Sequence, residues 1–259
     1  MAEAVETLEP KVVVGLDFGT TYSGFAFAFK ASPTDIYTHH VWPQSELRNY
    51  CKTKTELFYS RDSTGNLTLK SWGCRASADQ SRAQTALPND GGPAVGELVT
   101  KFKLHLADAG DGQESSAPPL PAPLTLKIAI TDYLRELSRF CMTELQKAYG
   151  DRWSMRDVQW CLTLPAMWDD HAKQLMASYA EDAGLVQKSG VRSEGSPHPI
   201  RIVLEPEAAS IYCLTTFKNQ LSIQEGEKFM TVDLGGGTAD IVIHEYMSSG
   251  DGEQNCPKV

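Results

Sequence analysis

The sequence has no long apolar run, few basic residues and no signal-peptide pattern. Its apolar runs are short and interrupted by charged residues, and residues 1–10 are acidic without an apolar core. The 24 lysines and arginines are outnumbered by 33 aspartates and glutamates, for a net charge of −9, whereas a nucleic-acid-binding surface needs an excess of basic residues. We therefore expect neither a nucleic acid nor a membrane as a partner.

Metal-binding and paired-cysteine patterns are missing as well. None of the six cysteines forms a C-x-x-C pair, and the six histidines form neither H-x-x-x-H nor H-E-x-x-H. Cys141, Cys161 and Cys213 lie in apolar segments, where a cysteine is usually a small buried hydrophobic residue. We therefore expect reduced cysteines, a cytoplasmic location and no metal site made by these residues.

The two common phosphate-binding loop motifs are also absent. Neither G-x-x-x-x-G-K-[ST] nor G-x-G-x-x-G occurs, which excludes the P-loop and dinucleotide-binding modes. The sequence instead alternates short β-branched runs with longer helical periodicities, which is typical of an α/β fold. The run at 11–17 (KVVVGLD) is predicted to be a fully buried strand. Further strands are expected at 22–30, 157–164, 200–204, 228–234 and 239–246, and helices at 125–149, 171–183 and 207–218.

An internal repeat is the most informative feature. Two strand–turn–strand units, far apart in the chain, each begin with an apolar run that ends in an aspartate, Asp17 or Asp233. When these aspartates are aligned, the turns align too: Gly19 with Gly235, Thr20 with Gly236, and Thr21 with Gly237. Two copies of one half-domain that face each other would form a cleft.

Each unit has the chemistry of a phosphate-binding turn. A glycine- and threonine-rich turn lets backbone N–H groups converge on an anion, and threonine hydroxyls add donors. A carboxylate beside a polyphosphate would be repelled unless a cation lay between them. Asp17 and Asp233 are therefore predicted to be outer ligands of hydrated Mg²⁺, with the two turns clamping the β- and γ-phosphates. The alternative is that both units are only tight hairpins, in which aspartate and glycine are common.

Four motifs in order resemble the actin, sugar kinase and heat-shock 70 superfamily. LDFGTTYSG and VDLGGGTADI resemble its phosphate-1 and phosphate-2 motifs, LTLPA at 162–166 is similar to its first connecting segment, and LEPEAA at 204–209 is similar to its E-P-x-A-A segment. The resemblance covers roughly residues 12–246. The segment LEPEAASIYC and the aromatic-rich first hairpin look most like the divergent heat shock 70 kDa protein 12 subfamily.

This resemblance implies roles for individual residues, with ATP or ADP and Mg²⁺ as cofactors. Glu205 would orient or activate the attacking water, together with Asp17 and Asp233, and Pro165 would act as a conformational switch. A lysine near the γ-phosphate is also implied, and the sequence leaves Lys101 and Lys103 as alternatives. The nucleotide-binding residues would be Gly19, Thr20, Thr21, Tyr22, Gly235, Gly236, Gly237 and Thr238. Glu205 could instead simply cap the helix that follows it.

The same resemblance divides the chain. We expect a disordered N-terminus at 1–10, a partial actin-like, ribonuclease H-like nucleotide-binding domain at 11–246, and a flexible tail at 247–259. Within the domain, about 31–124 would form a peripheral subdomain containing a flexible loop at 107–123, and 228–246 would begin a second lobe. That lobe normally continues well beyond this point, so the sequence predicts a truncated second lobe. We therefore expect weak nucleotide binding, marginal stability, or dependence on a partner or on self-association.

Three functions follow from these observations. The first is an ATP-binding, chaperone-like ATPase domain of heat-shock 70 type, acting in a stress response with client or regulatory proteins, here with weak or no turnover. The second is a non-catalytic interaction or regulatory protein that retains the fold. The third is a small-molecule kinase of the same superfamily, which the LTLPA and LEPEAA segments disfavour.

Overall fold

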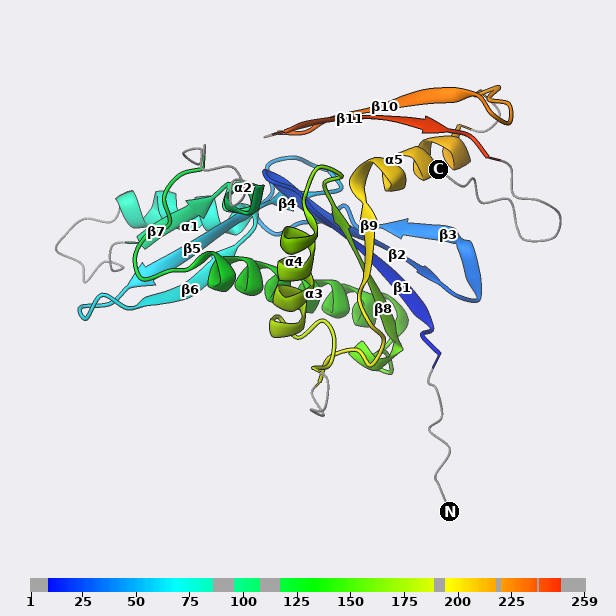
Figure 1. Cartoon of the computed structure of the whole chain (residues 1–259). Helices are drawn as coiled ribbons and strands as arrows, with labels where there is room; N and C mark the ends of the chain where they lie inside the picture. The colour runs from blue at the N-terminus through cyan, green and yellow to red at the C-terminus, as the bar shows by residue number, and fades with distance from the viewer. Residues whose placement is uncertain are drawn as a thin grey trace, which may run out of the picture.

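The main sheet of the protein has six strands. The computed structural model describes residues 9–85, 96–107, 117–188, 194–217, 220–236 and 238–247. The strand order is β3-β2-β1-β8-β9 with β4 attached to β2, and β1 is antiparallel to β2 but parallel to β8 (Figure 1). This α/β arrangement is the ribonuclease H-like order expected from the sequence. The strands are β1 (Val12–Phe18), β2 (Tyr22–Phe29), β3 (Ser32–Thr38), β4 (Thr53–Lys54), β8 (Val158–Leu164) and β9 (Arg201–Leu204).

Strand β1 is buried on one face only. Its residues alternate, and Val12, Val14, Leu16 and Phe18 are fully buried whereas Val13 is 38% exposed. The prediction of a fully buried strand at 11–17 was therefore wrong. The reason is that the intervening positions 15 and 17 line a cleft rather than a second hydrophobic layer.

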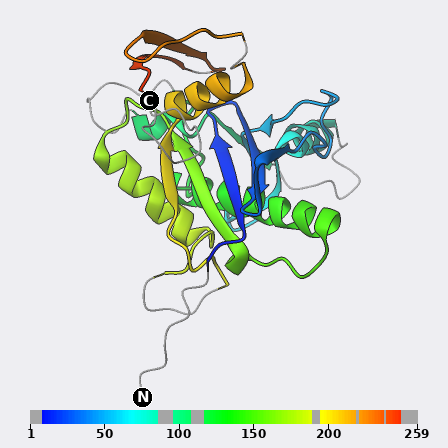
Figure 2. The same cartoon turned by 90° about the vertical axis from the view of Figure 1, so that its right-hand side faces the viewer.

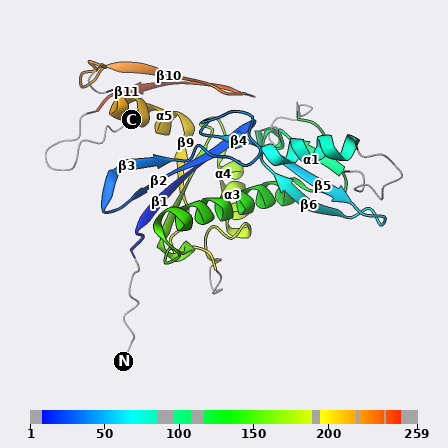
Figure 3. The ribbon, with the colours of Figure 1, turned by 180° about the vertical axis from the view of Figure 1, so that it is seen from behind.

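The long helix α3 (Leu126–Tyr149) covers the buried face and runs on toward β5 and β6 (Figure 3). The Thr125 hydroxyl caps its first turn by accepting a hydrogen bond from the Ile128 amide at 3.3 Å. Gly150, with φ of +97°, ends the helix. The helical periodicity places fully buried side chains on one stripe: Ile130, Tyr133, Leu134, Leu137, Cys141 and Leu145.

Two further elements complete this layer. The short 3-10 helix η2 (Met155–Asp157) leads directly into β8. Helix α4 (Asp170–Asp182) packs against α3, and the Asp169 carboxylate caps it by accepting from the Ala172 amide at 2.7 Å. The helices predicted at 125–149 and 171–183 are thus confirmed.

A second, three-stranded sheet lies beside the main one. Its order is β6-β5-β7, with α1 packed against it (left in Figure 1). The predicted peripheral range of 31–124 began too early in the chain, because β3 and β4 pair with β2 in the main sheet. The Tyr37 ring on β3 also stacks on the Phe27 ring on β2, with 5.5 Å between the ring centroids. The elements are β5 (Glu56–Arg61), β6 (Leu67–Trp72), α1 (Cys74–Thr85), β7 (Gly96–Thr100) and α2 (Leu104–Ala107).

The last described elements form a separate layer above the end of the main sheet. The antiparallel hairpin of β10 (Lys228–Leu234) and β11 (Ala239–Glu245) lies over helix α5 (Glu205–Thr216), as Figures 1 and 2 both show. The hydroxyls of Ser210 and Thr231 join helix and hairpin at 2.6 Å. Helix α5 begins two residues earlier than the predicted 207–218, so Glu205 is its first residue and not its cap.

Several predictions concern residues outside this description. They are the first eight residues, most of the loop at 107–123, residue 218, and the tail beyond residue 247. Within the described ranges, no helix has both the length and the hydropathy to cross a membrane. The described cysteines are all free: Cys51, Cys74, Cys141, Cys161 and Cys213.

Candidate functional site

A cleft of about 910 Å³ lies between the two repeated turns and beside α5. Of the predicted site residues, Gly237 lies outside the described residues, and Lys101 is the one described residue that does not line the cleft. All the others do: Asp17, Gly19, Thr20, Thr21, Tyr22, Lys103, Glu205, Asp233, Gly235, Gly236 and Thr238. The fold therefore gathers residues from four separate segments of the chain at one place.

The two hairpins share the same register. In the β1–β2 hairpin Asp17 is paired with Gly24, and in the β10–β11 hairpin Asp233 is paired with Asp240, seven residues later in each case. The last strand pair before each turn is also equivalent. The repeat inferred from sequence is therefore a structural repeat, with an aspartate at the end of each leading strand.

The turns approach each other closely. A Cβ added at Gly236 would lie 2.6 Å from Thr21 Oγ1 and 2.8 Å from Thr21 Cβ, so only glycine fits between the hairpins here. The buried Thr21 hydroxyl has no hydrogen-bond partner among the described residues. A buried hydroxyl without a partner is costly, and here it is a donor available to a ligand at the mouth of the two turns.

The structure decides between the two candidate lysines. The Lys103 side chain is 3% exposed, and its Nζ lies 2.8 Å from Glu205 Oε1. Its ammonium also sits over the rings of Phe18 and Trp168, at 5.6 and 5.2 Å from their centroids. Lys101 instead has a left-handed φ of 55° and an exposed side chain. Lys103, two residues further along the chain, is therefore the lysine that faces the cleft.

Glu205 occupies an unusual electrostatic position. The pKa of the Glu205 carboxyl is raised above its ordinary value, mainly because the carboxyl is buried. The positive charge of Lys103 lowers this pKa, whereas the nearby carboxylates of Asp17 and Asp240 raise it further. A carboxylate with a raised pKa at neutral pH is a better proton acceptor than an ordinary one. Its location at the start of α5 points it at the cleft.

Sequence reasoning did not identify two charged residues here. Lys52 lines the cleft, and its Nζ lies 2.5 Å from Asp17 Oδ2. Asp240 is buried opposite Asp233. The sequence did carry a signal for Asp240, because it stands in the VDLGGGTADI motif at the spacing that Gly24 has in the first hairpin. Lys52 had no such signal.

These residues fit a magnesium–nucleotide complex. A polyphosphate needs hydrogen-bond donors, which the Thr21 hydroxyl, unpartnered among the described residues, and the backbone at Gly19 and Gly236 can supply. A hydrated metal needs acceptors for its water molecules, which the two aspartates at the strand ends can supply. Within the described ranges, no group of three or more acidic, histidine or cysteine residues could ligate a metal directly. Contact of Asp17 and Asp233 with Mg²⁺ through metal-bound water stays a prediction.

Comparison with curated proteins finds significant sequence similarity to two heat shock proteins. The chain is 27% identical over 292 residues to heat shock 70 kDa protein 12A of Mus musculus, and 25% identical over 296 residues to heat shock 70 kDa protein 12B of Homo sapiens. Each alignment covers 90% of this chain and 40% of the relative. The chain thus spans about 40% of the length of the curated relatives it matches, and the resemblance drawn from the four motifs is confirmed. No protein-family model matches.

Comparison with solved structures finds distant neighbours. One is MreB5 of Spiroplasma citri bound to ADP, which is 14% identical, with a TM-score of 0.48, over 91% of this chain and 49% of that chain. Another is a non-polymerisable quadruple mutant of pCBH ParM, which is 11% identical, with a TM-score of 0.39, over 95% of this chain and 61% of that chain.

Proposed function

We propose that the cleft binds ATP or ADP together with Mg²⁺, and that the chain is an ATPase domain of heat-shock 70 type. The observation that carries the proposal is the pair of equivalent turns that face each other across one cleft, with the partnerless Thr21 hydroxyl between them. A tight hairpin needs neither a second copy opposite it nor a buried hydroxyl left free. The sequence similarity to heat shock 70 kDa protein 12A supports the same assignment.

The roles of the cleft residues follow from their positions. Backbone N–H groups of the two turns and the hydroxyls of Thr20, Thr21 and Thr238 would bind the phosphates. Asp17 and Asp233 would hold Mg²⁺ through its water molecules. When bound, the metal supplies positive charge that neutralises the β- and γ-phosphate oxygens.

Glu205 is the residue best placed to act on water. Its buried carboxylate would orient a water molecule toward the γ-phosphorus and accept its proton as the phosphorus–oxygen bond to the leaving diphosphate breaks. The ion pair with Lys103 holds this carboxylate in position. Pro165, which follows β8 directly, stays a predicted switch between nucleotide states.

Unfolding in the presence of nucleotide tests the proposal. Mg-ATP at a hundred times its dissociation constant is expected to add about 2.7 kcal/mol to the free energy of unfolding, because only the folded chain presents both turns. The measurement is the thermal or urea unfolding curve with Mg-ATP, with ATP plus EDTA as the control. A cooperative transition that Mg-ATP leaves unchanged would contradict the proposal.

One observation favours a second function, a non-catalytic interaction protein. The β10–β11 hairpin exposes an apolar row, of which Leu234 is the most exposed at 75%, followed by Ile243, Ile241 and Met230. Such a row on a surface is typical of protein contacts. A defined protein partner whose affinity is the same with and without ATP would support this alternative. Client binding, a stress-response role and a cytoplasmic location are likewise proposals.

A further inference from the structure

Lys52 is a second lysine at the nucleotide cleft. It lines the cleft, its Nζ lies 2.5 Å from Asp17 Oδ2, and its side chain is 35% exposed. Lys52 is therefore a cation at the strand end where the first turn begins.

The backbone around Lys52 is tied to that turn. Strand β4 pairs with β2, which places Thr53 beside Ser23 and Lys54 beside Tyr22. The next residue, Thr55, donates from its amide to the Thr21 carbonyl oxygen and from its hydroxyl to the Gly19 carbonyl oxygen, both at 2.8 Å. Lys52 is thus held in a fixed relation to the turn that would bind phosphate.

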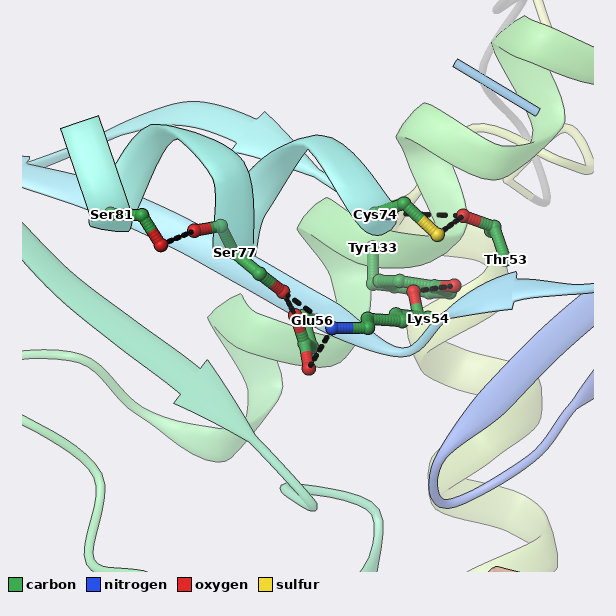
Figure 4. Close-up of polar contacts among 7 residues, drawn as sticks. All are labelled: Thr53, Lys54, Glu56, Cys74, Ser77, Ser81 and Tyr133. Atoms are coloured by element: carbon green, nitrogen blue, oxygen red, sulfur yellow. Dashed lines mark hydrogen bonds and ion pairs between the residues drawn. The ribbon is translucent and has the colours of Figure 1, made fainter. Parts of the chain in front are cut away.

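The other side of the same strand is anchored to helices α1 and α3 (Figure 4). The Tyr133 hydroxyl donates to the Lys54 carbonyl oxygen at 3.0 Å, and Thr53 Oγ1 accepts from the Cys74 amide at 3.1 Å. Lys54 Nζ donates to Ser77 Oγ at 3.0 Å, and Ser77 in turn bonds to Glu56. Lys54 therefore points away from the cleft, whereas its neighbour Lys52 points into it.

Gly24 leaves the space that the Lys52 side chain occupies. Gly24 is the strand partner of Asp17, and a Cβ at Gly24 would lie 2.6 Å from the Cys51 carbonyl oxygen and 3.2 Å from Lys52 Cγ. Any larger residue at 24 would displace the lysine stem. In the second hairpin the equivalent position is Asp240, so this arrangement belongs to the first turn.

We infer that Lys52 is a polyphosphate-binding residue of this site, an inference that rests on the proposed function. In the structure Lys52 neutralises Asp17. When Asp17 turns to the water shell of a metal, the half-buried ammonium needs another anion, because an unpaired charge there is costly. The anion that the first turn would bring within its reach is a phosphate of the nucleotide. When the nucleotide binds, the Lys52 ammonium thus leaves the Asp17 carboxylate and pairs with a phosphate oxygen.

Calorimetric titration of ADP at saturating Mg²⁺ tests this inference. Lys52→Met is expected to weaken ADP binding about tenfold, since one charged hydrogen bond to phosphate is lost. Lys52→Arg keeps the charge and should stay close to wild type. Lys54→Met is the matched control, because it removes the neighbouring ammonium that bonds to Ser77 outside the cleft. Lys52→Gln gives the same comparison if the methionine variant does not fold.

The outcomes separate the two proposals. Unchanged or tighter ADP binding by folded Lys52→Met would overturn the inference, because Lys52 would then only compete with the metal for Asp17. The proposed function would survive that result. Absence of ADP binding by the wild-type chain would contradict the proposed function and this inference with it.

Discussion

Replacing Glu205 with alanine is expected to lower the free energy of unfolding by about 3–5 kcal/mol, the usual cost of breaking a buried ion pair. The reason is that the Lys103 ammonium, on a side chain only 3% exposed, would be left beside Phe18 and Trp168 without its carboxylate partner. Urea unfolding of the two proteins at pH 7 measures the difference. The effect does not depend on nucleotide, so it tests the architecture of the cleft alone.

A surface pair of the same geometry is the control. Glu144 and Lys147 lie 2.7 Å apart on α3, with the lysine largely in solvent, so Glu144→Ala should cost less than about 1 kcal/mol. Lys103→Met added to Glu205→Ala should recover much of the loss, because no buried charge remains unpaired. If Glu205→Ala costs no more than Glu144→Ala, Lys103 is not held as the structure shows.

Gly236→Ala is expected to weaken Mg-ADP binding about a hundredfold, because small displacements of positioning groups have effects of that size. The added Cβ would meet Thr21 Oγ1 and Thr21 Cβ at distances no real structure tolerates, and the short, branched threonine has no room to give way. The two hairpins would have to separate. Titration of ADP into the folded variant measures the loss.

A second change on the same hairpin serves as the comparison. Ala239→Val adds bulk at the exposed first residue of β11, away from the cleft, and should leave the ADP dissociation constant within about twofold of wild type, as surface substitutions usually do. Equal affinity of Gly236→Ala and wild type would mean that the spacing between the turns does not matter. The phosphate clamp would then be wrong.

Features governed by local sequence were predictable. The helix predicted at 125–149 carries its apolar stripe within one continuous segment, and the structure forms α3 there, with Thr125 as its cap and not its first residue. The repeated turns could be recognised because aspartate, glycine and threonine at fixed spacing have few other uses. Their facing each other followed from the repeat itself.

Features governed by pairing between distant segments were not predictable. The position of Lys52 depends on β4 joining β2, some thirty residues earlier in the chain, and nothing in the residues around Lys52 encodes that pairing. The choice between Lys101 and Lys103 depended on which side chain is buried against Glu205, Phe18 and Trp168, all of them distant in sequence. The half-burial of β1 escaped prediction because a valine run has the same pattern whether its second face meets a helix or a cleft.

The most direct test of the clamp is a titration of ADP into the wild-type chain with Mg²⁺ and with EDTA, repeated with Asp17→Asn. We expect a single site with Mg²⁺, and binding at least about tenfold weaker both in EDTA and in the variant, because Asp17 needs the metal between itself and the phosphates. Binding that is equally tight in all three conditions, or no binding by the wild-type chain, would contradict the assignment of these two turns as a metal-assisted nucleotide site.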